Sequence, residues 1–186
     1  RSTPRLQVCT VMPDFPSPSA DALIHSEGLC ARIRAAIAAS DGWLSFADYM
    51  KLALYAPGLG YYSAGARKFG TAGDFVTAPE ISPLFSQCVA GQCAQVLEGL
   101  GGGSIIEPGA GTGIMAADIL LELERLNALP EQYLILEPSA DLQARQAETF
   151  TQRIPHLQTR VRWLDGSPEQ SLRGVLLANE VLDALP

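Results

Sequence analysis

The sequence predicts an α/β fold with a mostly parallel sheet, preceded by a helical segment. Two features carry this prediction. From residue 104 onward, short apolar runs alternate with segments of helical periodicity, which is typical of βαβ units and a parallel sheet. Before residue 100, apolar residues recur at the spacing of amphipathic helices.

The first half of the chain is expected to contain helices over 26–39, 46–54 and 83–98. Ser45 and Asp48 have the spacing of a capping box at the start of the second helix, and Thr77 and Glu80 share that spacing. Ser82, followed by a proline, is typical of an N-cap with proline at the first helical position.

The segment 55–85 is rich in glycine and aromatic residues. Long loops inside compact domains are usually lids or binding loops. Tyr55, Tyr61, Tyr62 and Phe75 are therefore candidates for an aromatic lid that excludes water from a site. The alternative is that these aromatic side chains belong to the core.

The second half has apolar runs at 104–107, 133–137, 160–164 and 174–178, with helical segments near 113–126 and 139–152. The chain stops just after the fourth expected strand, which would leave an apolar edge uncovered. We therefore expect a fragment of a longer protein that lacks its C-terminal part. The expected organisation is a tail over 1–24, a helical cap with a covering loop over 25–100, and the first half of a ligand-binding α/β domain over 101–186.

Composition excludes several classes of function. The formal net charge of −7 argues against nonspecific nucleic-acid binding, which needs clustered Lys and Arg. No apolar stretch approaches the roughly 18 residues of a membrane span. The 4 cysteines form no C-x-x-C pair, so we expect neither a metal site nor a disulfide framework.

The glycine loop at 109–113 follows the first expected strand, and its spacing limits the ligand. It lacks the lysine of a triphosphate-binding P-loop. Gly109, Gly111 and Gly113 also depart from the dinucleotide pattern, because the third glycine comes one residue early. Glu107, directly before the loop, would repel a pyrophosphate. S-adenosylmethionine carries no phosphate and fits better, although NAD remains an alternative.

Acidic residues follow three successive expected strands. Glu107 suits the ammonium of S-adenosylmethionine, directly or through water. Glu137 is placed to accept hydrogen bonds from both ribose hydroxyls, and Asp165 is placed to meet the adenine amino group. The bare backbone of the glycines allows close approach of the methionine arm. The alternative is a structural glycine turn with surface acids.

Five motifs occur in order, "DYMKLALYAPGLGYY", "GDFVTAPEISPLF", "EPGAGTG", "LILEPS" and "NEVLDALP". Together they resemble the MidA family of S-adenosylmethionine-dependent methyltransferases, over about residues 28–186. The resemblance implies a class I Rossmann-like methyltransferase fold with three αβα layers. It also implies arginine methylation on a protein, because mitochondrial members are complex I assembly factors, and one dimethylates an arginine of a complex I subunit.

The resemblance also implies site residues. The family's cofactor-binding positions map onto Glu107, Gly109, Gly111, Gly113, Glu137 and Asp165. The "GDF" stretch resembles the family's cofactor-covering loop, which places Gly73, Asp74 and Thr77 near the cofactor.

A substrate guanidinium is cationic and presents five donors, so a site that methylates it needs carboxylates. Asn179, Glu180 and Asp183 follow the fourth expected strand, at the edge where such sheets bind ligands. Glu180 and Asp183 are spaced to share a helical face. We expect these three residues to hold the substrate. The alternative is that Asp183 caps a helix and Glu180 is solvated.

The competing functions are a small-molecule methyltransferase, a noncatalytic assembly factor that retains the cofactor fold, and an NAD-dependent oxidoreductase. The expected partner is a protein substrate, with no nucleic acid and no membrane. The expected location is the bacterial cytoplasm if Met12 is the true start, and the mitochondrial matrix if the basic N-terminal tail is genuine. The oligomeric state stays open, a homodimer included.

Overall fold

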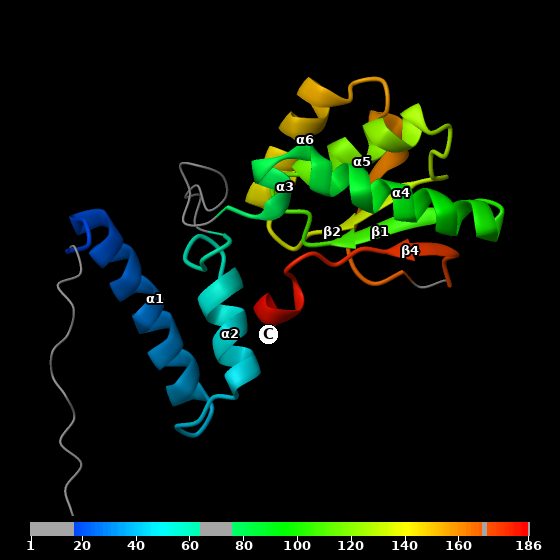
Figure 1. Cartoon of the computed structure of the whole chain (residues 1–186). Coiled ribbons are helices and arrows are strands. Elements are labelled where there is room, and N and C mark those ends of the chain that lie inside the picture. Colours follow the sequence, from blue (N-terminus) through cyan, green and yellow to red (C-terminus); the bar gives the residue numbers. More distant parts are fainter. Residues whose placement is uncertain (1–16, 64–75, 169–170, 186) are drawn as a thin grey trace, which may run out of the picture.

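The computed structural model describes residues 17–63, 76–168 and 171–185 (Figure 1). Its helices are α1 (Ala20–Ala39), α2 (Phe46–Tyr55), α3 (Ala78–Ile81), α4 (Pro83–Leu100), α5 (Ile114–Arg125) and α6 (Ala140–Arg153), with short 3-10 helices η1 (Gln158–Arg160) and η2 (Leu182–Ala184). Its strands are β1 (Ser104–Pro108), β2 (Tyr133–Leu136), β3 (Val161–Leu164) and β4 (Gly174–Leu176).

The four strands form one parallel sheet in the order β3-β2-β1-β4. Ile105 of β1 pairs with Tyr133 of β2 on one side and with Val175 of β4 on the other. Because all the strands run in the same direction, their carboxyl ends meet at one edge of the sheet. The predicted α/β fold with a parallel sheet is confirmed.

Helices α4, α5 and α6 contribute to a single core cluster with one face of this sheet (Figure 1). Ile105, Ile135, Ile119 and Phe150 are fully buried or nearly so, and burying such a side chain contributes about 1.5–3 kcal/mol. Figure 1 shows no helix covering the opposite face in the described part, and Leu176 of β4 is 68% exposed. The described part thus holds the sheet and one of the two expected helical layers.

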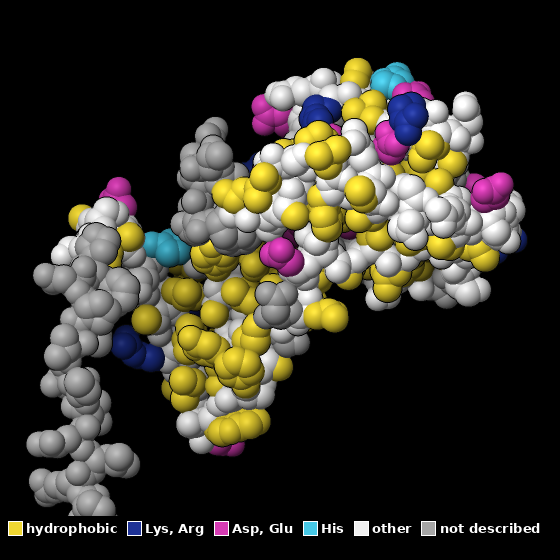
Figure 2. All heavy atoms as spheres, in the orientation of Figure 1, with side chains coloured by type: hydrophobic (Ala, Val, Ile, Leu, Met, Phe, Trp, Pro, Cys, Tyr) yellow, Lys and Arg dark blue, Asp and Glu magenta, His cyan; other side chains and the backbone are white. Residues whose placement is uncertain are grey.

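Helices α1 and α2 form a pair beside the sheet, outside the sheet core (Figure 1). Neither helix contains a buried residue, and apolar side chains gather on the surface of this pair (Figure 2). α1 begins at Ala20, inside the segment expected to be tail, because the Ser19 side chain accepts a hydrogen bond from the Ala22 amide and caps the helix. A nitrogen of the His25 ring lies 2.8 Å from the Leu59 carbonyl oxygen and links α1 to the segment after α2.

Two of the expected helix caps are confirmed and one is wrong. Ser45 accepts from the Asp48 amide at 3.0 Å, and Ser82 accepts from the Leu84 amide at 3.2 Å. Thr77 precedes α3 but makes no side-chain cap bond. Its expected partner Glu80 accepts a hydrogen bond from a residue of the glycine loop instead, so a tertiary contact replaces the local cap.

Candidate functional site

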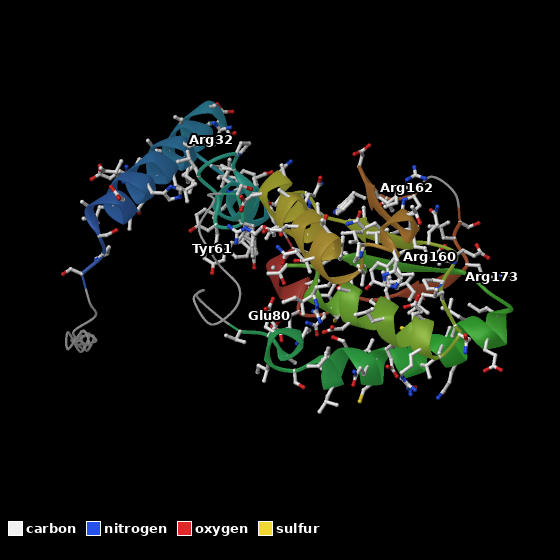
Figure 3. All side chains as sticks on the ribbon, turned by 90° about the horizontal axis from the view of Figure 1, so that it is seen from above. Arg32, Tyr61, Glu80, Arg160, Arg162 and Arg173 are labelled. Atoms are coloured by element: carbon white, nitrogen blue, oxygen red, sulfur yellow. The ribbon has the colours of Figure 1, made fainter. Side chains whose placement is uncertain are left out.

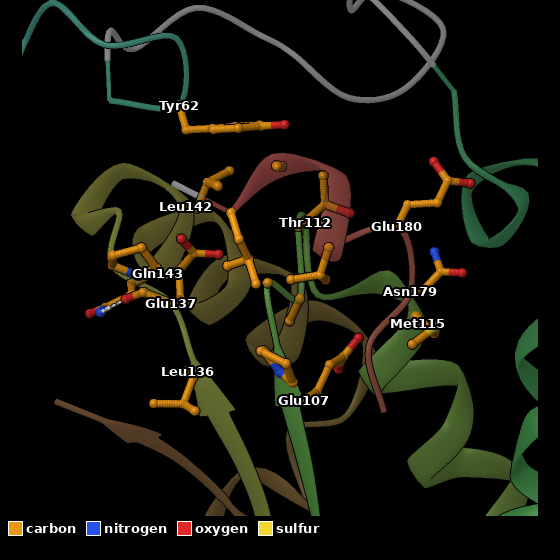
Figure 4. A pocket seen from close by; sticks show the side chains of 18 of the residues that line it. Tyr62, Glu107, Thr112, Met115, Leu136, Glu137, Leu142, Gln143, Asn179 and Glu180 are labelled. Atoms are coloured by element: carbon orange, nitrogen blue, oxygen red, sulfur yellow. Dashed lines mark hydrogen bonds between the residues drawn. The ribbon is translucent and has the colours of Figure 1, made fainter. Parts of the chain in front are cut away.

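A cavity of about 1100 Å³ opens at the carboxyl edge of the sheet (Figure 4). Its walls come from the carboxyl ends of β1, β2 and β3, from the segment after β4, from the glycine loop, and from the α2 and α3 region. Ligands of open parallel sheets bind at this edge. Among the described residues, the lining contains one basic side chain, Lys51, and five carboxylates: Glu80, Glu107, Glu137, Asp165 and Glu180.

The glycine loop forms the turn from β1 into α5. Gly109 and Gly111 line the cavity with left-handed backbone, at φ 66° and 55°. A Cβ on Gly109 would lie 3.2 Å from Cγ2 of Val181, so this position favours glycine for two reasons. Gly113 is not among the lining residues of the described part. It has φ 80°, and a Cβ there would lie 3.0 Å from the Phe150 ring, so this glycine lets α6 pack against the start of α5.

Glu107 lies in β1 at the floor of the cavity (Figure 4) and is 2% exposed. The Tyr133 hydroxyl donates a hydrogen bond to Oε2 of Glu107 at 2.6 Å. Burial raises the pKa of Glu107 to about 7, although the Tyr133 hydrogen bond lowers it and the charge of Glu137 adds to the rise.

Glu137 follows β2 directly and is 5% exposed. Its Oε1 accepts from the Ser139 amide at 3.0 Å, and its Oε2 accepts from Nε2 of Gln146 at 3.3 Å. Burial raises the pKa of Glu137 to about 6, partly offset by these two hydrogen bonds.

Neither Glu107 nor Glu137 forms an ion pair with a basic side chain in the described part of the chain. Buried carboxylates without a cation are costly, and a cationic or hydroxyl-bearing ligand would relieve that cost. Both acids line the same cavity as the bare backbone of Gly109 and Gly111. The residues present therefore fit a ligand with an ammonium and a ribose, as S-adenosylmethionine has.

Three further expected site residues line the cavity. Asp165 follows β3 and is exposed, while Asn179 and Glu180 follow β4 and lie across the cavity from Glu137 (Figure 4). The prediction that Glu180 and Asp183 share a helical face is wrong. Glu180 has left-handed backbone at φ 51°, and the helical turn η2 begins only at Leu182. The side chain of Asp183 lies outside the described part.

The expected aromatic lid is present in part. Tyr62 lies over the cavity (Figure 4), and its ring stacks on that of Tyr55, with centroids 5.6 Å apart. The Ser139 hydroxyl donates to the Tyr62 carbonyl oxygen at 2.8 Å and ties this segment to the start of α6. Tyr61 packs edge-on against Tyr62 at 5.0 Å and is not among the described lining residues.

The covering segment is described only from residue 76 onward. Thr77 lines the cavity as expected. Gly73, Asp74 and Phe75 lie outside the described residues.

Several lining residues were not predicted from the sequence, among them Lys51, Glu80 and Thr112. Glu80 accepts a hydrogen bond from the Thr112 hydroxyl at 2.5 Å, which joins α3 to the glycine loop. In the sequence, the spacing between Glu80 and Thr77 is also that of a helix cap. Nothing in the sequence therefore indicated that Glu80 bonds to Thr112. Within the described residues, no group of three or more His, Cys, Asp or Glu side chains is arranged to hold a metal ion.

A parallel sheet, a glycine loop without lysine, and buried acids at successive strand ends define a class: Rossmann-like α/β domains that bind a nucleoside cofactor at the carboxyl edge. A family model described as "Putative S-adenosyl-L-methionine-dependent methyltransferase" matches residues 88–186, and the chain belongs to this family. Together with the relatives and the ligand-bound structure described next, this match confirms the resemblance to the MidA family and S-adenosyl-L-methionine as the cofactor.

Curated relatives include the "Protein arginine methyltransferase NDUFAF7 homolog, mitochondrial" of Drosophila melanogaster, 31% identical over 92% of this chain and 44% of the relative. The Danio rerio protein arginine methyltransferase NDUFAF7 is 33% identical over 78% of this chain and 40% of the relative. The chain thus spans less than half the length of these relatives.

Solved structures from Burkholderia thailandensis are more similar. A "likely methyl transferase" bound to S-adenosyl-homocysteine is 50% identical, with a TM-score of 0.85 over 93% of this chain and 46% of that one. A second structure from the same organism is 48% identical, with a TM-score of 0.80 over 93% of this chain and 44% of that one. In the described residues, no helix has the length and apolar character to cross a membrane.

Proposed function

We propose that this chain is part of an enzyme that methylates an arginine side chain of a protein substrate. The observation that carries the proposal is the acidity of the cavity, whose described lining has five carboxylates against one lysine. Once Glu107, Glu137 and Asp165 are assigned to the cofactor, Glu80 and Glu180 remain for a substrate. A site of this charge attracts cations, and a guanidinium is a permanent cation. The mitochondrial relatives named as protein arginine methyltransferases support the same substrate class.

The distribution of charge outside the cavity agrees with a cationic substrate. Arg160 and Arg173 directly precede β3 and β4, at the amino ends of these strands. Together with Arg162 they lie away from Glu80 and the cavity edge (Figure 3). These three arginines therefore leave the acids that line the cavity uncompensated.

In this proposal the two walls of the cavity have different tasks. Glu107, Glu137, Gly109 and Gly111 bind the cofactor, and Asp165 meets its adenine end. When bound, S-adenosylmethionine supplies a methyl group on a sulfonium. The Tyr62 ring covers the site and excludes water. Such alignment of two reactants can lower a barrier by about 7–11 kcal/mol.

The opposite wall holds the substrate. Glu180 accepts hydrogen bonds from the guanidinium, and the Asn179 side chain orients it, while Asp183 adds a second carboxylate. The substrate nitrogen loses one proton when it gains the methyl group. Glu180 is exposed, so its carboxylate can take up that proton and release it to water. Thr77 lies on the cofactor side of the cavity, and the resemblance to the MidA family assigns Gly73 and Asp74 to cofactor binding.

The experiment compares the full-length natural protein with its Glu180→Gln variant, using labelled cofactor and cell extract. We expect label on arginine in a protein band with the wild type, and a loss of at least about tenfold in the variant with cofactor binding kept. Glu148→Gln, on the exposed surface of α6, is the matched control. Label found only in small solutes would contradict the proposal, and cofactor binding without any transfer would indicate a noncatalytic assembly factor.

The resemblance to the MidA family makes an arginine of a complex I subunit the first substrate to test. The bacterial structures are 50% and 48% identical to this chain, against 31% and 33% for the two mitochondrial relatives, which supports the bacterial cytoplasm as the site of action. In this scheme the cap, expected over 25–100, begins with α1 at Ala20, and residues 101–186 contribute to the cofactor domain.

A further inference from the structure

Gln146 of α6 is fully buried and connects three parts of the cofactor site. Its Nε2 donates to the Gly111 carbonyl oxygen at 3.0 Å and to Oε2 of Glu137 at 3.3 Å. Its Oε1 accepts from Nε1 of Trp163 at 2.8 Å. One side chain thus contacts the glycine loop after β1, the acid after β2 and the indole of β3.

These partners allow one orientation of the Gln146 amide. The indole N–H of Trp163 can only donate, while the Gly111 carbonyl and an ionised Glu137 can only accept. Rotating the amide by 180° would set its oxygen against the Glu137 carboxylate and its NH₂ group against the indole N–H. All three hydrogen bonds would then be lost in a place that water does not reach. The Trp163 indole and the Gly111 carbonyl therefore together fix which end of the amide faces the cavity acid.

The consequence for Glu137 is a carboxylate held at both oxygens. The Ser139 amide holds Oε1 and Gln146 holds Oε2, and Glu137 itself lines the cavity. A carboxylate fixed in this way does not have to lose rotational freedom when a ligand binds, and its remaining lone pairs keep their direction. Such preorganisation raises affinity for a ligand with two adjacent hydroxyls.

We propose that Trp163 and Gln146 are positioning residues that orient the Glu137 carboxylate toward the ribose hydroxyls of the cofactor. Neither side chain is among the described lining residues of the cavity, so both act through Glu137 and the Gly111 backbone. The proposal rests on the proposed function only in that the ligand is S-adenosylmethionine or its product.

The test measures binding by calorimetry with two ligands, S-adenosylhomocysteine and its 2′-deoxy analogue, on the full-length protein. Gln146→Met keeps the length of the side chain and removes its hydrogen bonds. Trp163→Phe removes the indole N–H and keeps an aromatic ring beside Phe150, whose ring centroid lies 5.9 Å away. Gln152→Met, on the exposed face of the same helix, is the matched control.

We expect wild-type protein to bind S-adenosylhomocysteine more tightly than the analogue. In Gln146→Met the affinity for S-adenosylhomocysteine should fall by about 10-fold or more, because hydrogen bonds to a charged group are lost. The affinity for the analogue should change much less, so the ratio of the affinity for S-adenosylhomocysteine to that for the analogue shrinks. Trp163→Phe should shrink the ratio in the same direction, and the double variant should add little to either change.

Two outcomes would overturn the inference. One is an equal loss of affinity for both ligands, which indicates a purely structural role. The other is a wild-type ratio in Trp163→Phe, the variant that remains informative if Gln146→Met fails to fold. A wild-type protein that binds neither ligand would instead overturn the proposed function, and this inference with it.

Discussion

The hydroxyl of Tyr133 donates a 2.6 Å hydrogen bond to Glu107, and the two residues are 0% and 2% exposed. Burial raises the pKa of both groups, that of Glu107 to about 7 and that of Tyr133 well above its ordinary value. Near neutral pH the floor of the cavity is therefore a carboxyl group close to its own titration point. A bound cation would favour its charged form.

Glu107 should make the protein less stable as the pH rises. Between the ordinary pKa of 4.5 and the folded value of about 7, the unfolded chain has released the Glu107 proton and the folded chain retains it. The free energy of unfolding should therefore fall across this window. The Glu107→Gln variant cannot titrate and lacks this loss. Above pH 7 its free energy of unfolding should exceed that of the wild type by about 3 kcal/mol. Urea unfolding of the ligand-free protein at several pH values measures the difference.

Glu148→Gln is the control for this stability profile, because Glu148 is exposed on α6. This control should track the wild type at every pH. A constant difference between Glu107→Gln and wild type from acidic to alkaline pH would show that Glu107 does not titrate in the folded protein as described.

Binding of S-adenosylhomocysteine should have the opposite pH dependence. The ammonium of this ligand favours ionised Glu107, and its ribose hydroxyls favour ionised Glu137, whose pKa is about 6. Affinity measured by calorimetry should rise at least about tenfold from pH 5.5 to pH 8. In Glu107→Gln the affinity should be lower at pH 8 and the rise smaller. An affinity independent of pH in the wild type would refute the assignment of these acids to the ligand.

Gly113 is expected to tolerate no side chain. Its φ of 80° is unfavourable for alanine, and the added Cβ would lie 3.0 Å from Phe150. Gly113→Ala should lower the free energy of unfolding by about 1–3 kcal/mol. Gly91, inside α4, is the matched control, since nothing lies within 4 Å of an added Cβ there. Gly91→Ala should stabilise the helix by about 0.5–1 kcal/mol. The same sign for both substitutions would contradict this account.

The bond between Thr112 and Glu80 should hold α3 against the glycine loop. Thr112→Val removes the donor and keeps the shape of the side chain, so Glu80 loses a hydrogen bond to its charged group. Amide exchange in α3, including the Ser82 amide that bonds to the Ala78 carbonyl, should become faster.

Thr149→Val is the control for this exchange experiment. The Thr149 hydroxyl donates to the carbonyl of the same residue, Thr112, at 2.7 Å from the side of α6. This variant should leave exchange in α3 unchanged. Equal effects of the two variants on α3 would mean that the loop as a whole, and not Glu80, restrains the helix.

The strands and most helices were predictable because their signals are local. The run 104–107, the acids that close successive strands and the cap at Ser45 are each contained in a few consecutive residues. The start of α1 was predicted too late, because a composition rich in proline and serine obscured the cap at Ser19. The prediction that Glu180 and Asp183 share a helical face was wrong, because Glu180 has left-handed backbone and η2 begins only after it.

By itself, the sequence determined the α/β fold, a glycine loop whose spacing does not suit a phosphate ligand, and the acids at the strand ends. Periodicity and spacing along the chain encode these features. Only the tertiary structure decided that Gln146 reaches Glu137, that Tyr133 donates to Glu107, and that Glu80 bonds to Thr112. The physical reason is that each of these hydrogen bonds joins residues from different elements. Their donors and acceptors meet only after the helices have packed on the parallel sheet.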